Sequence, residues 1–225
     1  MKPCRSARTS PSSPSAAWRS GSCSARNPGG PCVGYVTTMG DLDFRALWDR
    51  ALTYEEFVKQ SREHCSLWTG VYRLARIPPW ALEQACEQGR TFRLLVLAED
   101  WCGDASNTIP YVAKLGAQGH CLEMRVLRRD ENPEVMDRYV SGSARAIPIV
   151  ILLDDAWREV GHWGSRPAEL QAWVLEARKT TPKEELYPQI RRWYAKDKGE
   201  STLREILALL PRETSTVAAT TDDSQ

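Results

Sequence analysis

The stretch that decides the fold is LLVLAEDWCGDA, residues 94–105. Its first five residues form an apolar run typical of a buried strand, and the segment from Asp104 to Leu115 has the apolar spacing of a helix. Cys102 therefore lies where the first backbone N–H groups of a helix are unpaired and the helix dipole is positive. Because that environment favours the thiolate over the thiol, we expect Cys102 to be a catalytic nucleophile with a lowered pKa.

Cys102 has no second cysteine at the position that a dithiol enzyme would use, because Ala105 stands there. A dithiol cycle between these two positions is therefore excluded by chemistry. Two acids beside the cysteine are candidates for tuning its pKa, Asp100 and Asp104. A carboxylate of Asp104 close to the sulfur would oppose thiolate formation, but an acid near a helix start is also an ordinary partner of the helix dipole.

The chain as a whole has the composition of a globular protein. It contains 225 residues, of which 42% are hydrophobic and 26% charged, and its formal net charge is +1. A charge so close to zero creates no field that favours nucleic acid or a membrane surface. No apolar run approaches the length of a membrane span. We therefore expect neither a nucleic-acid partner nor a membrane partner.

The cysteine usage indicates reduced thiols. The chain has seven cysteines, an odd number, at irregular spacings and without a CxxC motif: Cys4, Cys23, Cys32, Cys65, Cys86, Cys102 and Cys121. This pattern predicts neither a disulfide framework nor a zinc site, so we expect a cytoplasmic protein without a metal or another cofactor. Cys65, Cys86 and Cys121 are candidate resolving thiols for Cys102, although a small buried hydrophobic side chain is the simpler interpretation of each.

The composition divides the chain into five segments. Residues 1–40 are rich in Ser, Pro, Gly and Arg, contain no acid, and are predicted to be disordered. They have the composition of an organellar transit peptide, although their prolines oppose an amphipathic helix, and translation could instead start at Met39. The remaining segments are a helical extension at 41–90, a domain at 91–180, C-terminal helices at 181–210 and a disordered tail at 211–225.

The domain at 91–180 alternates strands and helices. Strands are predicted at 92–98, 122–128, 149–153 and 157–163, and helices at 104–117, about 133–140 and 167–177. A strand–helix–strand crossover needs parallel neighbours, whereas the late hairpin needs antiparallel ones. The expected fold is therefore an α/β sandwich with a mixed central sheet.

Further signals stand in a fixed order around the cysteine. The triplet Trp101-Cys102-Gly103 is followed by Pro110, then by an acidic-Asn-Pro turn at 130–133, and then by Ile147-Pro148. In this order and at these separations the residues resemble the thioredoxin family, over about residues 91–178. The variant WCGDA is similar to a bacterial subgroup of thioredoxin-like proteins, with a single active-site cysteine.

This resemblance implies a thioredoxin-like three-layer sandwich with N- and C-terminal helical extensions. It also implies that the bond before Pro148 is cis and that this proline faces Cys102. The substrate-binding residues implied by the family are Trp101, Gly103, Ile147 and Pro148. In such a groove the backbone of Ile147 would pair with an extended partner peptide by strand addition, and Trp101 would shield the thiol.

The chain departs from thioredoxins in the residues that resolve a mixed disulfide. Ala105 replaces the resolving cysteine, and Val96 stands where thioredoxins bury an acid that assists it. The leading hypothesis is therefore thiol–disulfide exchange through Cys102 alone. Its partner would be a protein or a low-molecular-weight thiol or disulfide.

Two other hypotheses remain open. In the first, the fold is a redox-inert binding or scaffold module that recognises a partner at the groove beside Pro148, and Cys102 is incidental. In the second, Cys102 and an exogenous thiol hold an iron–sulfur cluster, as in monothiol glutaredoxins. Ala105 and Ser106 disfavour the second hypothesis because they differ from the residues that follow the cysteine in that family.

Overall fold

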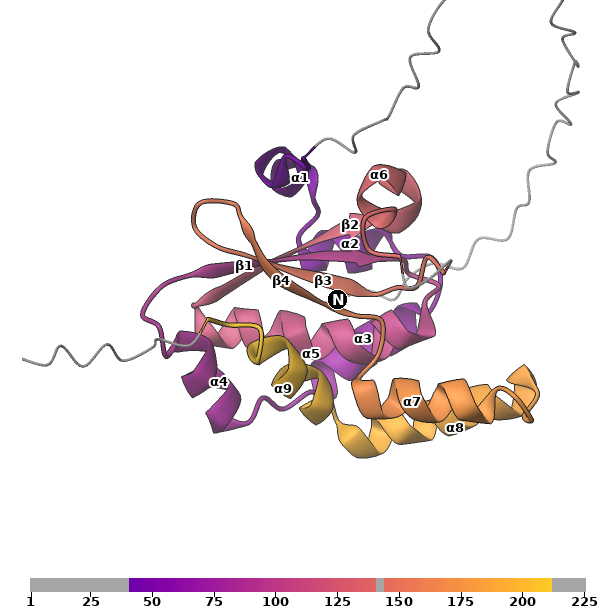
Figure 1. The fold of residues 1–225 in the computed structure, drawn as a ribbon. Coiled ribbons are helices and arrows are strands. Elements are labelled where there is room, and N and C mark those ends of the chain that lie inside the picture. The colour runs from indigo at the N-terminus through magenta and orange to yellow at the C-terminus, as the bar shows by residue number, and fades with distance from the viewer. Residues whose placement is uncertain (1–40, 141–143, 212–225) are drawn as a thin grey trace, which may run out of the picture.

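The computed structural model describes residues 41–140 and 144–211. The disorder predicted for 1–40, and for 211–225 beyond its first residue, falls outside these ranges. Within them, a central sheet carries helices on both faces, which gives three layers (Figure 1). The predicted α/β sandwich with flanking helical extensions is confirmed.

The sheet is mixed, as its sequence pattern predicts. Its strands are β1 (Phe92–Ala98), β2 (Leu122–Arg128), β3 (Ile149–Leu153) and β4 (Glu159–Gly164), in the order β2-β1-β3-β4. The β1–β2 pair is parallel, whereas the β1–β3 and β3–β4 pairs are antiparallel. All five residues of β3 are buried, as expected for a central strand that is covered on both faces.

The helices divide between the two faces of the sheet (Figure 1). One face carries α1 (Phe44–Arg50) and α6 (Pro133–Met136), which follows the short 3-10 helix η1 (Arg129–Glu131). Helix α2 (Tyr54–Gln60) lies at the β2 edge of the sheet, where it contacts both β2 and α3. The other face carries α3 (Cys65–Leu74), α4 (Pro79–Cys86), α5 (Gly103–Gly119) and α9 (Glu200–Leu207). The long helix α5 thus starts at the end of β1 and runs under the sheet.

The helical extension at 41–90 shares one hydrophobic core with the strands. Thr53 and Glu56 form a complete capping box at the start of α2, as their spacing predicts. Phe57 of α2 and Trp68 of α3 are fully buried in this core. The helices before the first strand are therefore integral to the fold rather than an appendage.

Helices α7 (Ala168–Ala177) and α8 (Lys183–Asp197) form a hairpin with a small core of its own. That core consists of Leu170, Val174, Leu186, Ile190 and Tyr194. In Figure 1 the hairpin projects from the sandwich at the end near the start of α5. The hairpin therefore brings C-terminal residues toward Cys102.

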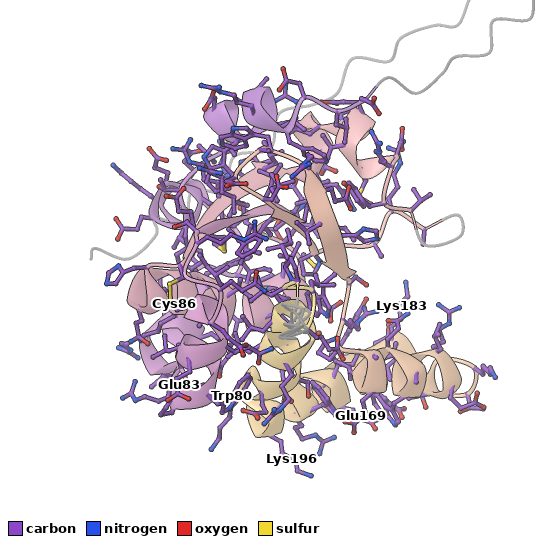
Figure 2. All side chains as sticks on the ribbon, turned by 60° about the vertical axis from the view of Figure 1, so that its left-hand side comes forward. Trp80, Glu83, Cys86, Glu169, Lys183 and Lys196 are labelled. Carbon is purple, nitrogen blue, oxygen red and sulfur yellow. A yellow bond between two sulfur atoms is a disulfide. The ribbon has the colours of Figure 1, made fainter. Side chains whose placement is uncertain are left out.

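Cys86 and Cys121 form a disulfide between the end of α4 and the start of β2 (Figure 2). The prediction of reduced thiols is wrong for this pair. The residues are 35 apart in the chain, and no local pattern links them, but the fold brings their Cα atoms to 5.3 Å. That separation lies in the ordinary range for a disulfide.

The disulfide also excludes both cysteines as resolving thiols for Cys102. Cys102 precedes the first residue of α5, and Cys121 follows its last turn, so the 17 residues of the helix separate them. At a rise of about 1.5 Å per residue the two ends lie roughly 25 Å apart. Cys86 is bonded to Cys121 and therefore lies at the same far end.

Candidate functional site

Cys102 is the N-cap residue of α5, at the junction with β1 that its sequence predicts. Its sulfur accepts a hydrogen bond from the backbone N–H of Ala105 at 3.4 Å. Its thiol donates to the carbonyl oxygen of Ile147, also at 3.4 Å. Cys102 is only 7% exposed. The sulfur is therefore held between a donor on the helix and an acceptor on the segment that precedes β3.

Burial raises the pKa of Cys102 to about 11, so the predicted lowering is wrong. The charge of Asp104 raises the pKa further, whereas the Ala105 N–H and the guanidinium of Arg166 lower it. The helix N-terminus thus acts in the expected direction, but the loss of water around the sulfur outweighs it. The hydrogen bond to Ile147 adds to this preference because it needs the proton of the thiol.

This pKa predicts slow alkylation of Cys102 at neutral pH. Only about 10⁻⁴ of the thiol would be ionised at pH 7, compared with about 3% for an ordinary cysteine. The rate with iodoacetamide, followed for the Cys102 peptide by mass spectrometry, should rise nearly tenfold per pH unit up to about pH 10. In urea-unfolded protein the same peptide should level off near pH 9.5. A plateau below pH 8 in the folded protein would contradict the assignment.

Ile147 and Pro148 lie on the other side of the sulfur. The peptide bond between them is cis, and both residues are buried. The Ile147 carbonyl faces Cys102 through the hydrogen bond described above. The structure thus brings Ile147 against Cys102, with Pro148 next to Ile147 in the chain.

Trp101 and Gly103 form the exposed edge of the site. The Trp101 side chain is 40% exposed, and the guanidinium of Arg129 lies 4.8 Å from the centre of its ring. Arg129 also donates to the carbonyl oxygen of Arg145 at 3.2 Å, which joins the Trp101 edge to the segment that leads into Ile147. The exposed Trp101 ring therefore lies next to the buried Cys102 in the chain.

Asp104 is held by two residues from the C-terminal part of the chain. The guanidinium of Arg166 pairs with its Oδ2 at 2.5 Å, and the hydroxyl of Tyr194 donates to its Oδ1 at 2.9 Å. Asp104 therefore affects the pKa of Cys102, and its negative charge raises that pKa. Arg166 offsets part of this effect through its own charge.

Asp100 faces away from this cluster. Its carboxylate accepts hydrogen bonds from the backbone N–H groups of Arg62 at 2.6 Å and Glu63 at 3.3 Å, and its carbonyl accepts one from the Trp68 indole at 3.0 Å. The pKa of Cys102 is set mainly by burial, Ala105, Asp104 and Arg166, and not by Asp100. The geometry gives Asp100 the role of anchoring the turn between α2 and α3 against the site.

Three residues that contact the site were not predicted from the sequence: Arg129, Arg166 and Tyr194. The sequence contains a signal for Arg129 only, since it directly precedes the acidic-Asn-Pro turn.

Cys65, the remaining candidate resolving thiol, is partly exposed at the start of α3, and its thiol donates to the Ser61 carbonyl at 3.2 Å. Among residues 41–140 and 144–211, no group of three His, Cys, Asp or Glu side chains is arranged to hold a metal ion. Within the same ranges, the helices are too short or too polar to span a membrane.

Comparison with known proteins agrees with the fold. A family model described as thioredoxin matches residues 51–186. A crystal structure of a protein of unknown function from Pseudomonas aeruginosa is similar at a TM-score of 0.60 and 19% identity, covering 75% of this chain and 97% of that one. An HIV epitope scaffold is similar at a TM-score of 0.57 and 18% identity, with the same coverage. No curated protein matches the chain.

Proposed function

The chain belongs to the thioredoxin family, and on that premise we propose that it exchanges disulfides with an extended protein segment through Cys102 alone. One observation carries the proposal: the thiol of Cys102 lies 3.4 Å from the carbonyl oxygen of Ile147, at the edge marked by exposed Trp101. A peptide that pairs with the Ile147 backbone by strand addition would bring its own sulfur to Cys102.

Docking of such a peptide would also activate the thiol. In the resting state the Ile147 carbonyl accepts the S–H hydrogen bond, which stabilises the protonated form. A substrate amide that donates to the same carbonyl competes for it, while the Ala105 N–H still donates to the sulfur. Substrate binding therefore shifts Cys102 toward the thiolate, and the thiol stays inert without a partner.

The exchange then needs no second protein thiol. The Cys102 thiolate, having released its proton to water, attacks a mixed disulfide on the partner and forms a bond to its small thiol group. The partner's cysteine leaves as a thiolate and takes up a proton. A low-molecular-weight thiol attacks the new disulfide, regenerates Cys102 and departs as a small disulfide. This route agrees with Ala105 in place of a resolving cysteine.

The Cys86–Cys121 disulfide bears on where this chemistry would occur. The expectation of a cytoplasmic protein depended on reduced thiols. Structural disulfides persist in oxidising compartments and are rare in the cytosol. We therefore propose an oxidising compartment as the place of action.

The proposal predicts a preference for peptide substrates. We compare kcat/KM for two substrates, a peptide that carries a glutathione mixed disulfide and oxidised glutathione. The value for the peptide should be higher by about tenfold or more. The reason is that only the peptide can pair with Ile147 and displace the thiol from its carbonyl. The thiol that leaves each substrate in the first step is the peptide cysteine or one molecule of glutathione. Its release, followed under an excess of a low-molecular-weight thiol other than glutathione, measures the preference.

A matched pair of tryptophan variants tests the groove. Trp101→Ala should remove most of the preference by raising KM for the peptide, since tryptophans contribute strongly at binding surfaces. Trp173→Ala, which alters a comparably exposed tryptophan on α7, should leave the preference unchanged. Equal rates for both substrates in wild-type protein would refute exchange gated by peptide docking.

The burial of Cys102 specifically favours a second candidate function. A thiol that is 7% exposed and whose pKa is raised to about 11 is poorly suited to attack on its own. In that alternative the protein binds an extended segment at the same groove without redox chemistry. Binding of a cysteine-free peptide with full affinity, together with no turnover of any mixed disulfide, would select it.

A further inference from the structure

A cavity of about 1070 Å³ opens on the helical face of the sandwich. Helices α3, α5, α8 and α9, together with the segment that enters α4, form its walls. Figure 1 shows these helices on one face of the sheet. The lining is mainly apolar and includes Leu67, Val71, Leu74, Ile77 and Leu203. Leu74 is 68% exposed, so the cavity leaves apolar surface in contact with water.

Gly70 leaves space in the α3 wall of this cavity. Glycine weakens the interior of a helix relative to alanine, so its presence there calls for a reason. Packing within residues 41–140 and 144–211 does not supply one, because a Cβ added at Gly70 would meet none of their atoms within 4 Å. A small residue that none of the described neighbours requires is suited to make room for a bound molecule.

The wall of the cavity opposite α3 is held in place by packing and by a hydrogen bond. Gly199, in the turn between α8 and α9, has a positive φ of 81°, and an added Cβ would lie 2.4 Å from the ring of Tyr111. That turn therefore packs directly on α5. Tyr194 is likewise fixed, since its hydroxyl donates to Asp104. The cavity thus lies between fixed walls on α5 and α8.

The charges around the cavity favour an anion. Its three cations are Arg76, Arg191 and Lys198, and none of them forms an ion pair within the part of the chain that the structure describes. The lining has two acids, one fewer than its cations, and a cation outside the lining already balances one of them. Asp197 accepts hydrogen bonds from the backbone and hydroxyl of Ser201, and Glu200 pairs with Arg204.

We propose that this cavity binds an amphipathic anion, whose apolar chain packs against α3 and α9 and whose carboxylate meets the cations of the rim. A volume of this size holds a small-molecule ligand. The apolar lining together with unpaired positive charge at the rim matches a long-chain carboxylate better than a neutral or cationic molecule. The site does not depend on exchange at Cys102.

Two probes of equal chain length and opposite charge test the proposal on the full chain. Dodecanoate and dodecylammonium are titrated below their critical micelle concentrations by calorimetry. Dodecanoate should bind at one site per chain, and dodecylammonium should bind at least about tenfold more weakly. No binding of dodecanoate, or equal affinity for both probes, would overturn the proposal.

Two matched pairs of variants assign the binding to this cavity. Gly70→Trp fills the space beside α3 and should weaken dodecanoate binding about tenfold or more, whereas Thr69→Trp, on the exposed side of α3, should not. Arg191→Gln should weaken binding several-fold, and Arg192→Gln, its exposed neighbour outside the lining, should leave it unchanged. Unchanged affinity in Gly70→Trp would overturn the proposal. So would a concentration-dependent mass in sedimentation that Gly70→Trp abolishes, since the face would then bind a second copy.

Discussion

Replacing Cys102 with serine will abolish turnover of a peptide mixed disulfide, lowering kcat/KM on the order of 10³-fold or more. A serine hydroxyl is not ionised near neutral pH and does not attack sulfur, so no covalent intermediate forms. The hydroxyl can still donate to the Ile147 carbonyl, as the thiol does, which preserves the local geometry. The same release assay that measures peptide preference measures the loss.

The control for this variant is Cys65→Ser, which alters the other cysteine that is outside the disulfide among residues 41–140 and 144–211. It should retain most of the wild-type rate because no step of the proposed cycle uses Cys65. Peptide binding by Cys102→Ser, followed by fluorescence anisotropy, should stay within about threefold of wild type, since Trp101 and the Ile147 backbone are unchanged. Undiminished turnover in Cys102→Ser would remove this residue from the mechanism. Loss of turnover in Cys65→Ser as well would point to a dithiol route.

The fold was largely predictable because its signals are local. The apolar run of β1 and the uniformly apolar β3 identify central strands without reference to the rest of the chain. The capping box at Thr53 and Glu56 involves residues three apart, so sequence alone reveals it. The N-terminal helices were harder to place, because only packing shows that Phe57 and Trp68 belong to the same core as the strands.

The chemistry of the site was less predictable because it depends on residues far apart in the chain. The position of Cys102 at a helix start is a local property, and it was predicted correctly. Its burial is not local, since the segment around Ile147 covers it from 45 residues away. Asp104 is similarly defined by Tyr194, 90 residues later. A prediction from the helix dipole alone therefore gave the wrong direction for the pKa of Cys102.

The Cys86–Cys121 disulfide was also not predictable from local sequence. An odd number of cysteines at irregular spacings correctly argues against a dense disulfide framework, but it does not exclude one bond. Cys86 ends a helix and Cys121 precedes a strand, and only the crossover through β1 and α5 brings them together. The bond therefore closes a loop that contains β1, Cys102 and the whole of α5.

Removing this bond should cost the fold about 2–4 kcal/mol in free energy of unfolding, because the closed loop spans 35 residues of separation in the chain. The suitable variant is Cys86→Ser/Cys121→Ser, which leaves no unpaired thiol. For a chain of this size the loss corresponds to a fall in Tm of about 5–15 °C, measured by circular dichroism. Wild-type protein in dithiothreitol should melt near the double variant, and the double variant should not respond to the reductant.

The double variant also separates stability from chemistry. The bond lies at the far end of α5 from Cys102, so the hydrogen bonds from Ala105 and to Ile147 should survive its loss. At a temperature well below its Tm, the double variant should therefore turn over the peptide substrate at close to the wild-type rate. An unchanged Tm would mean that the bond does not constrain the unfolded chain. A lost activity in folded double variant would instead mean that the bond positions the start of α5, and Cys86 and Cys121 would then be positioning residues for the sulfur.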